Sequence, residues 1–217
     1  FELVNPYAKK VRQHPGMLFD GFDLEADILE ISKRIENAGG VVMEIGSGSG
    51  EHLIALAKSQ PETLFLGFEW RFKRAVRTIE KAKTEGLSNI IVFRADAGSV
   101  WTRCLMPESL KAMYINFPDP WAKRRQRKHR IVSHKLLQEL CRYLCPDGKF
   151  IFRTDHREYF EWAISHLDNY IADARFSYEI ITRDLLNSRY APDFFPTEFQ
   201  RLFLGQGLPV HLLKVSR

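Results

Sequence analysis

Short apolar runs alternate with longer amphipathic segments along most of the chain. The run 41–45 is bounded by glycines and is typical of a buried strand, whereas the apolar residues of 24–35 recur at the helical period. Runs of the first kind predict seven strands, at 41–45, 64–68, 90–94, 112–115, 149–153, 177–182 and 210–215. Segments of the second kind predict helices at 24–35, 51–58, 70–84, 133–144 and 158–168.

This alternation of strands and helices predicts an α/β fold. Strands that are separated by helices form a parallel sheet that is covered on both faces. We find no internal repeat, low-complexity tract or linker, so we expect one domain over residues 1–217. Residues 1–20 contain Pro6, Pro15 and Gly16, and we expect them to form an irregular N-terminal arm.

Acidic residues lie at or just after the ends of the first five predicted strands. In order along the chain they are Glu44, Glu69, Asp96, Asp119 and Asp155. Ligands of parallel α/β sheets bind beyond the carboxyl ends of the strands. Five carboxylates at one edge are difficult to explain by solvation, so we interpret this edge as a binding site.

A glycine-rich loop, residues 44–51, joins the first predicted strand to its helix. Its glycines allow the backbone to bend and to approach a ligand closely. Glu44 and Glu51 at its two ends would oppose a pyrophosphate, and they suit a cationic ligand such as the amino and sulfonium groups of S-adenosylmethionine. We therefore expect Glu44, Gly46 and Gly48 to bind that cofactor.

Two further acidic positions fit the rest of such a cofactor. Glu69 can accept from both ribose hydroxyls, and Asp96 can accept from the adenine amino group with the backbone amide of Ala97 nearby. Each has a structural alternative, because Glu69 could be a favourable charge at a helix N-terminus and Asp96 a helix cap.

The run Asn116-Phe117-Pro118-Asp119-Pro120-Trp121 ends the fourth predicted strand. Its prolines stiffen the turn, and six of the next eight residues after Ala122 are basic. These are Lys123, Arg124, Arg125, Arg127, Lys128 and Arg130. A rigid acidic and aromatic turn beside a basic strip predicts a nucleobase held for chemistry with its phosphates held nearby. The alternative is a proline turn followed by a solvated charge run, and Trp121 either stacks on a base or packs in the core.

Composition narrows the class of protein. The 217 residues are 45% apolar and 27% charged, which is enough for a packed core, and the net charge of +5 collects around 9–12, 71–83 and 123–130. Such clusters favour a polyanionic partner. Three cysteines exclude a disulfide scaffold and favour a reducing, cytoplasmic compartment. No apolar stretch approaches the ~20 residues of a membrane span, no metal-ligand set is present, and residues 1–5 have no signal-peptide pattern.

With these motifs, the chain resembles the bacterial tRNA (guanine-N7)-methyltransferases of the TrmB type. The matching segments are 11–14, 44–51, 114–121 with its basic tail, 130–132, 152–155, 197–200 and 207–210. The resemblance implies a Rossmann-like class I methyltransferase fold: a mostly parallel seven-stranded sheet with helices on both faces and an antiparallel last strand. It also implies S-adenosylmethionine as donor and N7 of a guanosine in the tRNA variable loop as acceptor.

The resemblance also implies roles for individual residues. The cofactor positions of the family fall on Glu44, Glu69, Asp96 and Asp119. Its substrate positions fall on Lys123, Asp155 and the segment from Thr197 to Gln200. Gln200 stands where the family usually has Glu, Gln126 where it has His, and His129 where it has Arg. These departures concern RNA contact and catalytic efficiency and leave the methyl-donor positions unchanged.

Guanine N7 carries a free lone pair, so no general base is needed before it attacks the methyl group. Catalysis then depends on alignment and on a carboxylate that stabilises the developing cationic base. Asp119 is the expected catalytic residue, and Asp155 is the other candidate. The shape of the RNA and an extruded base would set specificity.

Two other functions fit the same residues. One is a class I methyltransferase that acts on another RNA or on a non-RNA substrate. The other is a non-catalytic RNA-binding module with the same fold, for which the departures at Gln126, His129 and Gln200 are the only support. The sequence leaves open whether the protein is a monomer or a homodimer.

Overall fold

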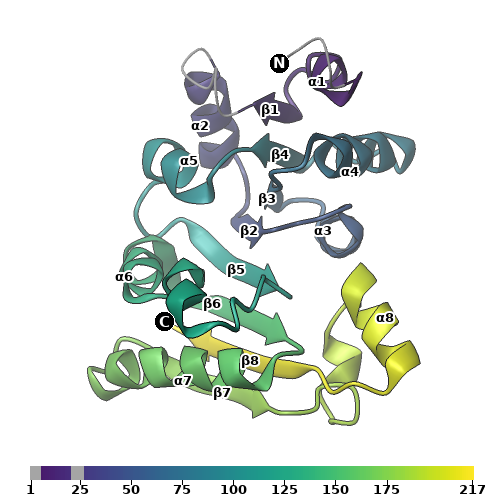
Figure 1. Cartoon of the computed structure of the whole chain (residues 1–217). Helices are drawn as coiled ribbons and strands as arrows, with labels where there is room; N and C mark the ends of the chain where they lie inside the picture. Colours follow the sequence, from purple (N-terminus) through teal and green to yellow (C-terminus); the bar gives the residue numbers. More distant parts are fainter. Residues whose placement is uncertain (1–5, 21–26) are drawn as a thin grey trace. The chain divides into compact units, whose positions relative to one another are not determined.

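The computed structural model describes residues 6–20 and 27–217, apart from the side chains of residues 8 and 202–204 (Figure 1). The predicted start of the first helix at residue 24, and the expectation for residues 1–5, lie outside the described residues. The chain divides into two compact units, Phe1–Met106 and Pro107–Arg217.

The N-terminal unit contains four parallel strands. They are β1 (Leu18–Asp20), β2 (Val41–Ile45), β3 (Leu64–Phe68) and β4 (Ile90–Arg94), in the order β1-β4-β3-β2. Every residue of β3 and β4 is buried, as expected for parallel strands covered on both faces. The largely apolar runs that predicted these strands reflect that burial.

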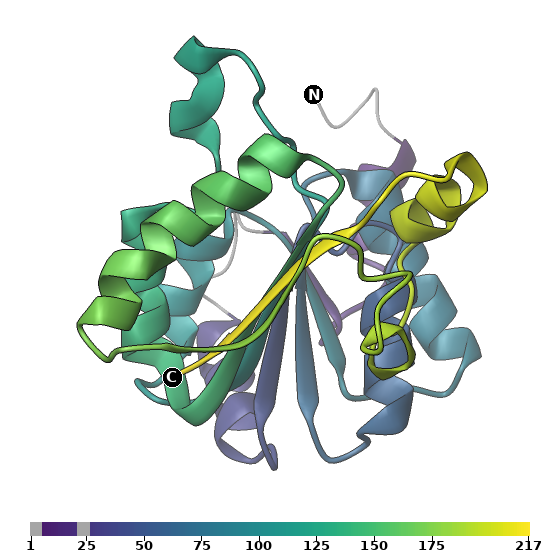
Figure 2. The same ribbon diagram turned by 90° about the horizontal axis from the view of Figure 1, so that it is seen from below.

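Five helices cover this sheet (Figures 1 and 2). They are α1 (Pro6–Val11), α2 (Ile28–Glu36), α3 (Glu51–Ser59), α4 (Phe72–Thr84) and α5 (Ala97–Cys104). The helix α4 packs on β4 and is contacted by α1 and α3, while α2 and α5 contact each other. Buried apolar residues recur at the helical period, for example Ile31 and Ile35 in α2.

The expectation of an irregular arm is wrong for residues 6–20. They form α1 and β1, and Leu18 of β1 pairs with Val92 of β4. A strand of three residues is too short for a recognisable period, and pairing with its neighbour is what defines it. Pro6 occupies the first position of α1, where its missing N–H costs no intrahelical hydrogen bond.

The C-terminal unit contains four strands of mixed direction. They are β5 (Leu110–Asn116), β6 (Leu144–Thr154), β7 (Ser177–Thr182) and β8 (His211–Ser216), in the order β5-β6-β8-β7. The strands β5 and β6 are parallel, whereas β8 is antiparallel to β6 and to β7. The predicted antiparallel last strand is confirmed, and the described strands exceed the predicted seven by one, β1.

Two long helices and several short ones flank this second set of strands. They are η1 (Arg124–His129), α6 (His134–Tyr143), α7 (Arg157–Ala172), η2 (Ala191–Asp193) and α8 (Glu198–Gln206). Figure 2 shows α6 and α7 on one side of these strands and α8 on the other. Within the described ranges, no helix has the length and apolar character that a bilayer crossing requires.

Three histidines have a pKa below the ordinary 6.5, in each case chiefly because of burial. They are His14, His166 and His211. The ring of His211 is 4% exposed and stacks on Phe160 at 5.1 Å.

The lowered pKa values predict a loss of stability in mild acid. The unfolded chain binds more protons than the folded one below about pH 6.5, so this stability is present above pH 6.5 and is lost as the pH falls toward the folded pKa values. Urea unfolding at about pH 7.5 and about pH 5.5 measures it. His211→Leu should reduce the difference between the two free energies of unfolding, and an unchanged difference would contradict the assignment.

Candidate cofactor and nucleic-acid site

The parallel register of the N-terminal unit brings three strand ends to one edge of its sheet. Ile45 pairs with Phe68, and Phe68 with Phe93. The backbone continues this alignment past the strands, because Gly46 N–H donates to Phe68 O at 2.8 Å and Glu69 N–H donates to Phe93 O at 3.0 Å. The predicted positions therefore lie at neighbouring strand ends: Glu44 is the penultimate residue of β2, and Glu69 and Asp96 come just after β3 and β4.

The glycine loop is open on one side and tightly packed on the other. Gly46 and Gly48 have φ of +76° and +58°, and an added Cβ at either would meet nothing within 4 Å. Gly50 has φ of +76°, and an added Cβ there would lie 2.3 Å from Cγ2 of Thr78 on α4. The loop is thus held against α4 at Gly50 and leaves space over Gly46 and Gly48 for a ligand.

Glu44 is buried, with 2% exposure, and its carboxylate is held in place. Its Oε1 lies 3.2 Å from Nδ1 of His52, on the first turn of α3. Our reading of the sequence did not single out His52. The sequence feature that could have predicted its role is its position directly after the glycine loop, next to Glu51. This contact orients the first predicted cofactor carboxylate.

Glu69 and Asp96 each receive a backbone hydrogen bond. Oε1 of Glu69 accepts from Arg71 N–H at 2.8 Å, and Oδ1 of Asp96 accepts from Ser99 N–H at 3.1 Å. Asp96 is therefore the cap of α5, which was the alternative interpretation, and it is exposed. A carboxylate has two oxygens, so one oxygen of each remains for the predicted ribose and adenine contacts. Ala97 opens α5 beside them.

In the C-terminal unit, Asp119 and Asp155 follow the ends of two neighbouring parallel strands. Asn116 at the end of β5 pairs with Arg153 near the end of β6. Asp119 and Asp155 are both exposed. The register therefore brings this predicted pair to the same edge of this unit's sheet.

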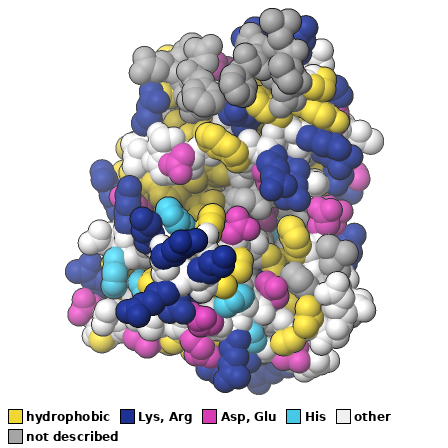
Figure 3. All heavy atoms as spheres, in the orientation of Figure 1, with side chains coloured by type: hydrophobic (Ala, Val, Ile, Leu, Met, Phe, Trp, Pro, Cys, Tyr) yellow, Lys and Arg dark blue, Asp and Glu magenta, His cyan; other side chains and the backbone are white. Residues whose placement is uncertain are grey.

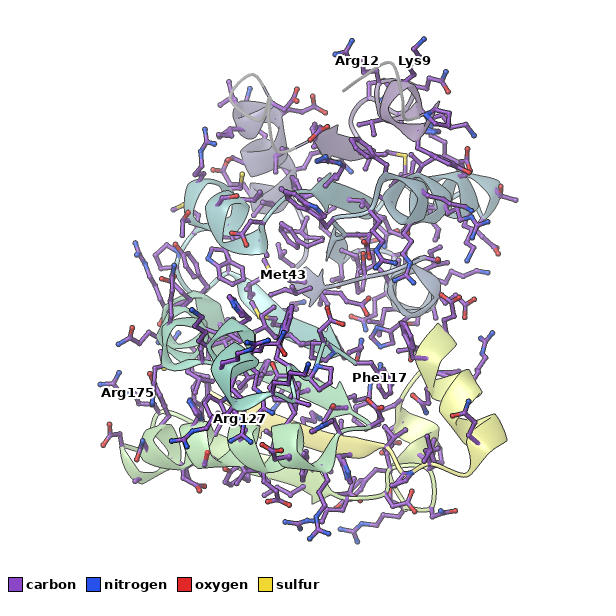
Figure 4. The ribbon with its side chains drawn as sticks, viewed as in Figure 1. Lys9, Arg12, Met43, Phe117, Arg127 and Arg175 are labelled. Carbon is purple, nitrogen blue, oxygen red and sulfur yellow. The ribbon has the colours of Figure 1, made fainter. Side chains whose placement is uncertain are left out.

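The segment 116–121 carries backbone strain. Phe117 and Trp121 have φ of 49° and 45°, a left-handed conformation that non-glycine residues rarely adopt. Such residues persist only where surrounding contacts fix them, and they cluster at functional sites. Phe117, labelled in Figure 4, donates its N–H to Arg153 O at 2.8 Å. Trp121 is half-buried, and its ring lies 5.3 Å from that of His129.

A buried arginine connects the strand end to the segment 195–200. The Arg153 side chain has 0% exposure. Its Nε donates to Asn116 Oδ1 at 2.6 Å, and one terminal nitrogen donates to Phe195 O at 2.9 Å and to Gln200 Oε1 at 3.0 Å. Thr197 Oγ1 accepts from Gln200 N–H at 3.0 Å and so caps α8.

These contacts place Thr197 and Gln200 differently from the substrate contacts expected of them. Both residues are buried, at 7% and 4% exposure, and both organise the start of α8. The pattern Thr-x-x-Gln is a capping-box signature, which would have predicted the helix that follows. Arg153 was missed as well, because only its place next to Asp155 distinguishes it in the sequence.

The basic strip is partly exposed and partly structural. Lys123, Arg124, Arg125 and Lys128 are exposed, and Figure 3 shows blue side chains gathered in this region. Arg127, labelled in Figure 4, is half-buried and pairs with Glu158. The strip therefore offers fewer free cations than its sequence indicates.

The expected phosphate contact of Arg130 is corrected by the structure. Arg130 is 3% exposed, its Nε donates to Pro120 O at 2.9 Å, and its guanidinium lies 4.8 Å from the ring centroid of Tyr159. Burial lowers its pKa. Its guanidinium packs against the segment 116–121 and the Tyr159 ring, and it is therefore inaccessible to RNA.

This fold is also found in solved methyltransferases. The 16S rRNA methyltransferase KamB matches with a TM-score of 0.63 and 16% identity, over 87% of this chain and 92% of that one. A family model described as "Putative methyltransferase" matches residues 38–213. The fold and the acidic strand ends define a class I methyltransferase.

Sequence relatives identify the family. A tRNA (guanine-N(7)-)-methyltransferase of Lactobacillus johnsonii is 30% identical over 96% of this chain and 94% of its own length. A bifunctional glycosyltransferase/methyltransferase of Fusobacterium nucleatum is 34% identical over 92% of this chain, which spans only 30% of that protein. The chain belongs to the tRNA (guanine-N(7)-)-methyltransferase family.

Proposed function

We propose that this protein transfers a methyl group from S-adenosylmethionine to N7 of a guanosine in the variable loop of tRNA. Family membership supports the reaction. The observation that carries the proposal is the segment 116–121, where an exposed Asp119 stands between two strained residues at a strand end and directly before a basic strip.

The N-terminal unit offers the groups that S-adenosylmethionine requires. Glu44, held by His52, suits a cationic amino group, and the open backbone at Gly46 and Gly48 allows close approach. Glu69 suits the ribose hydroxyls, and Asp96 with the Ala97 amide suits the adenine edge. When bound, the cofactor supplies an electrophilic methyl group on a sulfonium.

The C-terminal unit offers the groups that a guanosine requires. The lone pair of N7 attacks without losing a proton, so the protein's task is alignment and charge stabilisation. The Asp119 carboxylate stabilises the positive charge that develops on the base. Asp155 accepts from the N1–H and N2–H edge of guanine, while Lys123, Arg124, Arg125 and Lys128 hold phosphates.

The single-domain organisation and the cytoplasmic location belong to the same proposal. We place one catalytic domain over residues 1–217, because the reaction requires both the cofactor residues of the N-terminal unit and the guanosine residues of the C-terminal unit. A cytoplasmic location agrees with a tRNA substrate, and it agrees with Cys104, Cys141 and Cys145 being free thiols.

The decisive experiment is nucleoside mass analysis of unmodified tRNA after incubation with the protein and S-adenosylmethionine. The expected product is 7-methylguanosine. Transfer to a different nucleoside, or to a substrate other than tRNA, would favour the first alternative. Cofactor binding without any transfer to tRNA would favour the non-catalytic RNA-binding module.

Asp119→Asn should reduce methyl transfer to tRNA by about 10²–10³-fold, because it removes the negative charge opposite the developing cation. Single-turnover transfer with radiolabelled cofactor measures the loss, and circular dichroism checks the fold. Asp173→Asn, an exposed change after α7, is the matched control and should keep full activity. Near-normal turnover of the Asp119 variant would refute the catalytic assignment.

The triple change Lys123→Ala, Arg124→Ala and Arg125→Ala should weaken tRNA binding and flatten its salt dependence. Each lost phosphate contact lowers the slope of log K against log salt by about one. Binding titrations between about 50 and 200 mM salt measure the slope. The control is Lys111→Ala, Lys135→Ala and Arg175→Ala, three exposed cations elsewhere in the same unit. An equal slope in both triple variants would move the RNA contact away from η1.

A further inference from the structure

The N-terminal unit has a second basic surface on α1 and α4. Between Arg71 and Thr84 the chain has six Lys or Arg residues and one acidic residue, Glu80. The opposite side of α4 is apolar and buried, with Ala75, Val76, Ile79 and Ala82 facing the core. The charges therefore gather on the outer side of one helix, where Figure 3 shows dark blue side chains.

Three of these cations form a row along α4. Lys73, Arg77 and Lys81 are four residues apart and exposed, so they lie on one face, with about 6 Å of helix between neighbours. Like charges at this spacing destabilise a helix, so the row does not stabilise α4. Its interval suits neighbouring phosphates on an RNA strand.

Few carboxylates neutralise this row. Glu80 pairs with Lys10 of α1 at 3.0 Å, and Glu51 lies 4.0 Å from Lys81, which also donates to Ser49 O. Among the residues that the structure describes, no carboxylate lies within 4 Å of Lys73 or Arg77. These two cations are thus available to an external anion.

The helix α1 extends the surface. It contacts α4, and Figure 4 shows Lys9 of α1 and Arg12, which directly follows α1, pointing outward. The pKa of His14, which follows α1, is lowered by burial first and next by Lys83, while Glu80 acts in the opposite direction. Both helices therefore present the same charge to solvent.

We propose that α1 and α4 bind the tRNA phosphate backbone at a second contact region, separate in sequence from η1. This inference rests on the proposed function. The partner it fits is an extended polyanion, because a row of separate cations contacts successive phosphates without reading bases.

Lys73→Ala with Arg77→Ala tests this surface. At about 50 mM salt the dissociation constant for tRNA should rise about tenfold, and the salt slope should fall by about one to two. Calorimetry should show unchanged affinity for S-adenosylmethionine. The control is Lys135→Ala with Arg175→Ala, which should leave affinity and slope unchanged.

Two results would overturn the inference, and they are distinguishable. If the wild-type protein methylates tRNA and the Lys73/Arg77 variant keeps the wild-type slope, the surface serves another purpose and the proposed function stands. If the wild-type protein neither binds nor methylates tRNA, the proposed function fails and this inference fails with it.

A different observation, the buried Arg153, carries a second inference. Its guanidinium joins the end of β5 at Asn116 to the start of α8 at Gln200, and its backbone O accepts from the strained Phe117. Without the hydrogen bonds of this guanidinium, the segment 116–121, which carries Asp119, would lose its support. We infer that Arg153 is a positioning residue for methyl transfer, again on the basis of the proposed function.

Arg153→Lys and Gln200→Leu test this role. Lysine at position 153 keeps the positive charge but cannot donate to several acceptors in the planar geometry of a guanidinium. Leucine at position 200 removes one acceptor of Arg153. Both should lower kcat about ten- to a hundredfold with little change in KM for tRNA, because small misplacements cost large rate factors. Gln200→Glu keeps the acceptor and should keep kcat.

Thermal unfolding separates positioning from stability. The inference holds if kcat falls in variants that unfold at the wild-type temperature. It is overturned if a folded Gln200→Leu protein keeps wild-type kcat, and this variant decides the matter even if Arg153→Lys does not fold.

Discussion

Parallel strand pairing is the constraint on which the rest of this structure depends. Neighbouring parallel strands end at the same edge of the sheet, so residues that are far apart in the sequence lie near each other at that edge. Ile45, Phe68 and Phe93 are in register in the N-terminal unit, as are Asn116 and Arg153 in the C-terminal unit. Glu44 lies in β2 itself, and the short loops after the other strand ends carry Glu69, Asp96, Asp119 and Asp155.

Backbone and buried side-chain contacts make these loops rigid. Each of the three carboxylates in the N-terminal unit has a partner that orients it: His52 for the buried Glu44, Arg71 N–H for the buried Glu69 and Ser99 N–H for the exposed Asp96. A preorganised carboxylate stabilises a developing cation without first reorienting. The chemistry proposed here needs no proton transfer before attack, so orientation is the main contribution that the protein can make.

The sequence predicted the parts of the fold that are determined locally. Buried apolar runs identified seven strands, and amphipathic periods identified the long helices. Short elements were missed: β1 because of its length, α1 and α5 because no helical period was recognised in them, and α8 because the cap at Thr197 was not recognised. Arg130 was misread for a related reason, since its charge is visible in the sequence while its burial against Tyr159 is not.

The structure gives a physical explanation of the departures from the family pattern at Gln126, His129 and Gln200. Gln200 stands where the family usually has a carboxylate. Its Oε1 accepts from Arg153, and its backbone N–H donates to Thr197 Oγ1 at the cap of α8. The substitution changes charge and keeps geometry. Gln126 and His129 belong to η1, where Gln126 N–H continues the turn by donating to Lys123 O and the ring of His129 lies 5.3 Å from that of Trp121. Fewer cations on that strip weaken the attraction to phosphates. Gln126 and His129 therefore argue for modified RNA affinity, whereas the buried Gln200 concerns the support of the segment 116–121 through Arg153.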